Sequence, residues 1–247
     1  MINKKTMMSY VYDQLAIDYN CSPGDFLKDG FIFTEAKQNE GRRLYPWVTP
    51  RLEMVSFGSG VVINASTDIL PLLRKLAENR TCDEIFWAPF IYGPNLYLLP
   101  DLGRLAPLAK VDGYEYEFVE EQDIHKLYQF EGFGYVLHYG DSYLFPEMLI
   151  SLAKYKGDVV GIAGAHAGCK SLWSINVDVL PPYRGKGLAS ALVNMLTLEV
   201  LNRGYVPYYF TSEWNVHSIR AAIRAGYTYA WVHCYKTRLD SLQTFHP

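Results

Sequence analysis

The run from Val177 to Ala189 holds the residues of this sequence that are best suited to chemistry. A β-branched stretch ends at Pro181-Pro182, and two glycines then flank Lys186 before an amphipathic helix begins. Backbone N–H groups are unpaired at the start of a helix, and the helix dipole adds partial positive charge there. Glycine lets a ligand approach the backbone closely. This order of strand, glycine loop and helix therefore predicts a site for an anionic phosphate group.

The residue types and their spacing distinguish among three known phosphate-binding motifs. A Walker loop requires a hydroxyl residue after its lysine, which this loop lacks, and a dinucleotide fingerprint requires a third glycine where this chain has Ser190. The pattern that fits is Arg/Gln-x-x-Gly-x-Gly/Ala, matched by Arg184, Gly187 and Ala189. It resembles the coenzyme A pyrophosphate loop of the GNAT superfamily of N-acetyltransferases. The alternative for so short a motif is a solvated turn that carries a basic residue.

A second block of residues extends this resemblance. Asn215 and Ser218 open a predicted helix that ends at Gly226-Tyr227, and this arrangement resembles the second coenzyme A-contacting block of the superfamily. Asn215 is suited to cap that helix, or to bridge two splayed strands and the pantetheine arm of the ligand. Both blocks occur in the order and at the separation typical of the superfamily, so the resemblance covers more than one loop.

The elements that must position these motifs are predicted from hydrophobic periodicity. Residues 172–179 read as a buried strand, and apolar residues from Leu188 onward follow one helical stripe that stops at Arg203-Gly204. The further predictions for this part are a strand at 114–119, a helix opening at 120–123, a hairpin of strands at 158–166 and 169–179, and a short strand at 206–211.

The resemblance implies a mixed α/β fold class. A GNAT acetyltransferase domain is expected over residues 112–247, with a central mixed sheet that contains a splayed strand pair and is flanked by helices. Residues 1–111 are predicted to form a smaller α/β domain of unknown role, because the boundary region contains prolines and glycines. The elements predicted for that domain are β structure over 52–65, a helix over 69–76 capped by residues 66–68, and strand over 82–99.

The resemblance also implies direct transfer of an acetyl group from acetyl-coenzyme A to an amine. In the superfamily a backbone N–H on the splayed strand polarises the thioester carbonyl; this position corresponds to Val179, with Val177 nearby pairing to pantetheine. The residues expected to hold the coenzyme are Val177, Val179, Arg184, Gly185, Lys186, Gly187, Leu188, Ala189, Asn215 and Ser218.

A base is needed to remove a proton from the incoming ammonium, because only the neutral amine attacks. The candidates are Asp178 on the splayed strand and Glu213 after the next strand, with His166 and Glu131 as alternatives. A chain of water molecules could serve instead. Each candidate also has a structural interpretation, as a solvent-facing carboxylate or a hydrogen-bonded histidine.

Ala222 occupies the position where many members of the superfamily carry the tyrosine that protonates the departing thiolate. Alanine cannot donate a proton, so the chain resembles a branch without that tyrosine, and the general acid is unassigned. Two functions from different classes follow. The first is an acetyl-coenzyme A-dependent N-acetyltransferase acting on a primary amine of a small molecule or peptide. The alternative is a non-catalytic coenzyme A-binding module that acts as a sensor or interaction protein.

Composition bounds the remaining classes. Of the 247 residues, 49% are hydrophobic and 20% charged, as in soluble globular proteins, and the formal net charge of −3 argues against a nucleic-acid surface. No apolar run is long enough for a membrane span. The four cysteines lack the pair spacing of a metal site; they are Cys21, Cys82, Cys169 and Cys234. We therefore expect a cytoplasmic protein that uses acetyl-coenzyme A, an amine acceptor and no metal, with a homodimer left open.

Overall fold

The computed structural model describes residues 2–43, 51–86, 92–139 and 146–236. They form two compact units. Unit 1 comprises Leu98–Thr211 and Asn215–Tyr229 together with the first residues up to Met7, and unit 2 comprises Met8–Tyr97, Ser212–Trp214 and the chain from Ala230 onward. This division differs from the predicted boundary at residue 112, because the last strand of the chain pairs with a strand of the N-terminal half. The two predicted domains remain a proposal.

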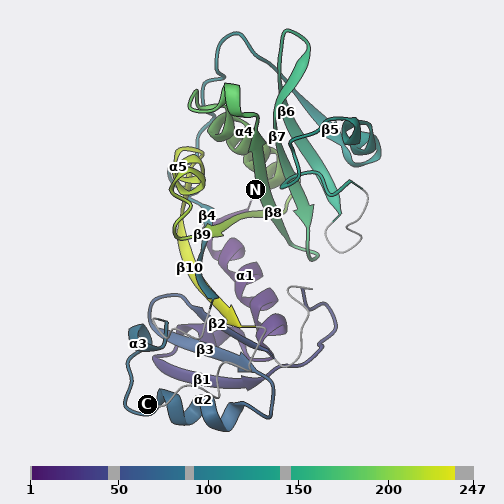
Figure 1. Ribbon diagram of the computed structural model, residues 1–247. Coiled ribbons are helices and arrows are strands. Elements are labelled where there is room, and N and C mark those ends of the chain that lie inside the picture. The colour runs from purple at the N-terminus through teal and green to yellow at the C-terminus, as the bar shows by residue number, and fades with distance from the viewer. Residues whose placement is uncertain (1, 44–50, 87–91, 140–145, 237–247) are drawn as a thin grey trace. The chain divides into compact units, whose positions relative to one another are not determined.

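Unit 1 contains a five-stranded run of mixed sheet in the order β9-β8-β7-β6-β5 (Figure 1). The β8–β9 pair is parallel, and the other pairs are antiparallel. The elements are β5 (Glu115–Glu120), η2 (Glu121–Gln129), β6 (Glu147–Tyr155), β7 (Asp158–Ala167), β8 (Leu172–Val179), η3 (Pro181–Tyr183), α4 (Leu188–Asn202), β9 (Val206–Ser212) and α5 (Val216–Arg224). The mixed α/β fold predicted for the C-terminal half is confirmed, as are its hairpin and the helix that starts at Leu188.

The two faces of this sheet are covered by different elements. Helix α4 packs on β6, β7 and β8, and the Ser151 hydroxyl donates to the Leu192 carbonyl on that face at 2.9 Å. The neighbouring residues of β6, Ile150 and Leu152, point to the opposite face, where they form a core with Ile124 and other residues of η2 and the segment after it. Each side chain of the central strands therefore faces either α4 or the η2 side.

Two predictions for unit 1 need correction. The helix expected to open at residues 120–123 is a 3-10 helix, η2, which ends at Gln129. Strand β6 was absent from the sequence prediction, although it pairs with both β5 and β7. Leu149 to Ala153 are buried in succession, so both faces of β6 are covered, as is typical of a strand inside a sheet.

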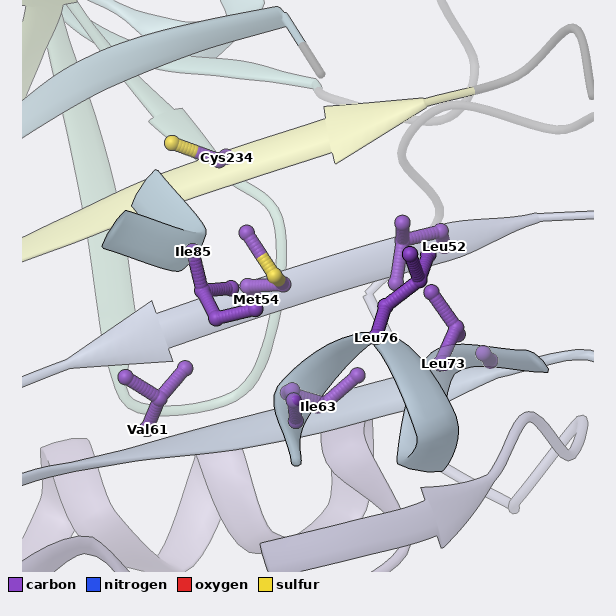
Figure 2. Packing of buried hydrophobic residues seen from close by; sticks show 10 residues of the cluster. Leu52, Met54, Val61, Ile63, Leu73, Leu76, Ile85 and Cys234 are labelled. Carbon is purple, nitrogen blue, oxygen red and sulfur yellow. The ribbon is translucent and has the colours of Figure 1, made fainter. Parts of the chain in front are cut away.

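Unit 2 contains strands in the order β1-β3-β2-β10, in which β1 and β3 are parallel and the other pairs antiparallel. Its core gathers Leu52, Met54, Val61, Ile63, Leu73, Leu76, Ile85 and Cys234 (Figure 2). The elements are η1 (Pro23–Leu27), β1 (Gly30–Glu35), β2 (Leu52–Ser56), β3 (Gly60–Ala65), α2 (Leu70–Ala77) and α3 (Cys82–Phe86). Among the described residues, four elements contribute to both units: α1 (Lys4–Tyr19), β4 (Tyr92–Pro100), β9, of which only Ser212 belongs to unit 2, and β10 (Tyr227–Lys236).

The sequence predictions for the N-terminal half are partly wrong. Residues 52–65 form the expected β structure, with the bend between β2 and β3. The predicted side-chain cap of α2 is absent, because the Ser66 hydroxyl accepts the Arg51 N–H and the Thr67 hydroxyl donates to Glu35. The strand predicted over 82–99 is helix at its start and strand from Tyr92, with residues 87–91 outside the described part. No helix in the described ranges is both long and apolar enough to cross a membrane.

Candidate functional site

The site is built around a fork between strands β8 and β9. Their parallel pairing starts at Leu172 and Val206 and, within the described part of the chain, ends at Ile175 and Tyr209. Strand β8 nevertheless continues to Val179, and it stays paired with β7 on its other edge as far as that residue. Beyond the fork, this edge of β8 has no partner strand among the described residues, so its backbone groups can bind a ligand.

Strand alternation determines which backbone groups face this edge. The N–H of Leu180 donates to the Val160 carbonyl, toward β7, at 3.0 Å. The N–H and C=O of Val179, one residue earlier, therefore point to the opposite edge, and those of Val177 have the same direction. The guanidinium of Arg184 agrees with this orientation, because its Nε donates to the Val179 carbonyl at 2.7 Å. Arg184 is thus tied to the strand by one of its nitrogens.

The loop between β8 and α4 carries a row of backbone N–H donors. Gly185 and Gly187 have φ angles of 77° and 90°, in the left-handed region that favours glycine, and Gly187 is the N-cap of α4. The first helical bond runs from the Ala191 N–H to the Gly187 carbonyl at 3.1 Å. Among the described residues, no hydrogen-bond acceptor is found for the N–H groups from Gly185 to Ser190. Such a row at a helix start binds anions.

Lys186 adds positive charge to this loop and lies against tyrosine rings. Its Nζ is 3.5 Å from the Tyr114 hydroxyl and 5.4 Å from the centroid of the Tyr183 ring. Tyr155 completes the cluster, with its ring centroid 5.4 Å from that of Tyr114 and 5.7 Å from that of Tyr183. The ammonium group is therefore held against these rings by cation–π and hydrogen-bond contacts.

The second motif forms the start of α5. The Asn215 side chain accepts the Ser218 N–H at 3.2 Å, which confirms the predicted N-cap. The Ser218 hydroxyl is also 2.8 Å from the hydroxyl of Tyr209, the last described residue of β9 that pairs with β8. Tyr209 is buried, and this burial raises the pKa of its phenol. The motif therefore connects α5 directly to the fork.

Tyr209 is a residue whose place in the site was missed from the sequence. It sits in an aromatic strand where nothing marks one ring as different from its neighbours. Ala222, at the position of the usual tyrosine, is fully buried and lies one helical turn after Ser218, on the same face of α5. The phenol of Tyr209, on β9, therefore lies against the face of α5 that carries Ala222, the position at which many family members have a tyrosine.

Asp178 lies on the η2 face of β8, opposite to Val177 and Val179. One of its carboxylate oxygens accepts the Tyr135 N–H at 2.9 Å. Burial raises the pKa of Asp178, although the N–H groups of Tyr135 and Val136 oppose this rise. The carboxylate therefore holds the segment after η2 against β8, and its raised pKa suits proton transfer.

The other base candidates lie in different surroundings. Glu213 is exposed and belongs to unit 2, where its N–H donates to the Pro94 carbonyl at 3.2 Å. Glu131 is exposed in the segment after η2. His166 is 1% exposed, and burial lowers the pKa of its imidazole to about 4. His166 lies on the η2 face with His138 and Glu147, and their possible ligand atoms lie within 4.8 Å of one another.

Comparisons with known proteins bear on the part of the chain that contains the loop. The model of the acetyltransferase (GNAT) family matches residues 113–227. A search of curated proteins finds no match. Among solved structures, a GCN5-related N-acetyltransferase-like protein from Streptococcus suis is 21% identical, with a TM-score of 0.46 over 73% of this chain and 72% of its own. An acetyltransferase from the GNAT family from Colwellia psychrerythraea is 15% identical, with a TM-score of 0.48 over 68% of this chain and 63% of its own.

Proposed function

We propose that this chain, which belongs to the GNAT acetyltransferase family over residues 113–227, transfers the acetyl group of acetyl-coenzyme A to a primary amine of a small molecule or peptide. The observation that carries the proposal is the open edge of β8 beyond the fork, which leads directly into the N–H row of the loop from Gly185 to Ser190. The open edge of β8 suits an extended amide-bearing arm, and the N–H row of the loop suits a pyrophosphate.

The direction of the strand bears on the roles proposed for Val177 and Val179. The phosphate end of the ligand belongs at the loop, which follows Val179 directly in the chain. An extended arm that runs from the loop toward the fork passes Val179 first and Val177 about 7 Å later, since a strand rises about 3.3 Å per residue. The Val179 carbonyl is already engaged by Arg184. We therefore propose Val177 as a second candidate, beside Val179, for the N–H that donates to the thioester oxygen.

Proton removal from the amine is proposed for Asp178. Its raised pKa brings the carboxyl closer to neutral pH than an ordinary aspartate, which favours general-base catalysis. Its side chain lies on the η2 face of β8, while the side chains of Val177 and Val179 lie on the face that carries α4. The acceptor would thus approach from the side of the sheet that carries η2.

Proton donation to the departing thiolate is proposed for Tyr209. An ordinary tyrosine has a pKa of about 10, so the phenol is protonated at neutral pH, and its hydroxyl lies 2.8 Å from that of Ser218, which orients it. A tyrosine on β9 would thereby take the role for which Ala222 on α5 has no suitable group.

Two measurements test the proposed function. Calorimetric titration should give binding of acetyl-coenzyme A, and a panel of primary amines should contain at least one that accelerates release of free thiol. Absence of binding would refute the site itself. Binding without turnover across a broad panel would instead favour the alternative of a coenzyme A-binding sensor, for which the alanine at position 222 is the supporting observation.

A further inference from the structure

A second group of chemically active side chains lies on the η2 face of unit 1. Glu147 begins β6 and is the register partner of His166 on β7, so both side chains emerge on the same face of the sheet. His138 comes from the segment after η2, and its ring centroid lies 4.8 Å from that of His166. The three residues offer two imidazole nitrogens and one carboxylate oxygen within 4.8 Å of one another.

Two nitrogens of this group are buried without a hydrogen bond. Within the described part of the chain, neither Nδ1 of His138 nor Nδ1 of His166 has a hydrogen-bond partner. The His138 Nδ1 is 3.6 Å from Oε1 of Glu147, which is too long for a hydrogen bond. Two ligands at about 2.1 Å from one tetrahedral ion are separated by about 3.4 Å. The spacing therefore suits a shared ion better than a direct contact.

The surrounding contacts orient His166 and Glu147. The Nε2 of His166 lies 2.8 Å from the Val136 carbonyl, so this nitrogen carries the proton and the lone pair of Nδ1 is directed to the group. Glu147 accepts the Tyr128 hydroxyl on Oε2 and the His138 N–H on Oε1, both at 2.6 Å. Histidine ligands that donate to a carbonyl, and ligand carboxylates that are themselves hydrogen-bonded, are typical of metal sites.

We propose that His138 Nδ1, Glu147 Oε1 and His166 Nδ1 form a binding site for one divalent transition-metal ion, with Zn²⁺ as the best match. Two imidazoles and one carboxylate are a ligand set found in zinc sites that keep a fourth position open. His138 is the most exposed of the three, with 28% of its side chain accessible. No metal is expected from the sequence, because its four cysteines lack the pair spacing of a metal site. The three ligands proposed here come from separate segments of the chain.

The test uses the full chain, freed of metal with a chelator and then titrated with Zn²⁺ and with Co²⁺. Wild type should bind one ion per chain with a Kd in the micromolar range or below, and Co²⁺ should give the visible absorption of a tetrahedral site. His138→Ala should weaken binding at least 100-fold. Tyr128→Phe, which removes the hydroxyl that donates to Glu147, should weaken it about 10- to 100-fold.

His125→Ala is the matched control, because His125 is exposed on η2 and should leave affinity and the Co²⁺ spectrum unchanged. Circular dichroism establishes that each variant folds, and Glu147→Gln replaces His138→Ala if the latter does not. The proposal is overturned if wild type binds no ion, or if binding persists unchanged in both His138→Ala and Glu147→Gln. These outcomes are independent of acetyl transfer, so they separate the metal site from the proposed function.

Discussion

Replacing Gly187 by alanine should weaken the binding of acetyl-coenzyme A in addition to lowering the stability of the fold. Gly187 caps α4 with φ of 90°, and an added Cβ would meet only Val111 Cγ2 at 3.8 Å, so the cost is one of backbone conformation. An alanine in the left-handed region costs about 1–2 kcal/mol. If the loop relaxes to negative φ instead, the N–H row turns away from the phosphate, and the loss of one charge-assisted hydrogen bond costs about 1.5–3 kcal/mol. Affinity for acetyl-coenzyme A should fall about 10- to 100-fold.

Gly204→Ala provides the matched control at the other end of α4. Gly204 has φ of 85° and open space around an added Cβ, so alanine there carries the same conformational cost, about 1–2 kcal/mol, without touching the loop. Both variants are compared by urea denaturation and by calorimetric titration with acetyl-coenzyme A. Equal affinity losses in the two variants, or an unchanged affinity in Gly187→Ala, would refute the assignment of the N–H row to the pyrophosphate.

Three further predictions address the remaining parts of the molecule. Tyr209→Phe should lower kcat about 100-fold and leave affinity for acetyl-coenzyme A unchanged, since proton transfer contributes about 10²–10⁴-fold; an unchanged kcat in steady-state thiol release would exclude the phenol as the acid. Burial lowers the pKa of His233 to about 3, so the unfolded chain takes up its proton first. The free energy of unfolding should therefore fall as pH drops from about 6.5 toward 3, by about 2 kcal/mol at pH 4.5; His233→Gln should show a shallower slope in urea titrations, and equal slopes would contradict this. Ile63→Ala should cost about 2–5 kcal/mol in urea denaturation, because Ile63 is 1% exposed in the core of unit 2 (Figure 2); a loss below 1 kcal/mol would show that this core repacks.

The loop and its flanking elements could be predicted from sequence because their determinants are local. Prolines end β8, two glycines supply positive φ, and a single apolar stripe defines α4, all within one stretch of chain. The Asn215 cap is equally local, since donor and acceptor lie three residues apart. The 3-10 character of η2 was missed, because the same residues and acidic start also suit an α-helix.

The sequence by itself determined the local geometry of the anion site, and tertiary structure decided which side chains surround it. The fork needs β8 and β9, Tyr209 reaches Ser218 across two elements, and Asp178 holds a segment from before β6. The group of His138, Glu147 and His166 exists only because β6 pairs with β7 and the segment after η2 folds over their ends. Contacts of this kind depend on strand register and on chain closure over long separations, and neither leaves a periodic signal in the sequence.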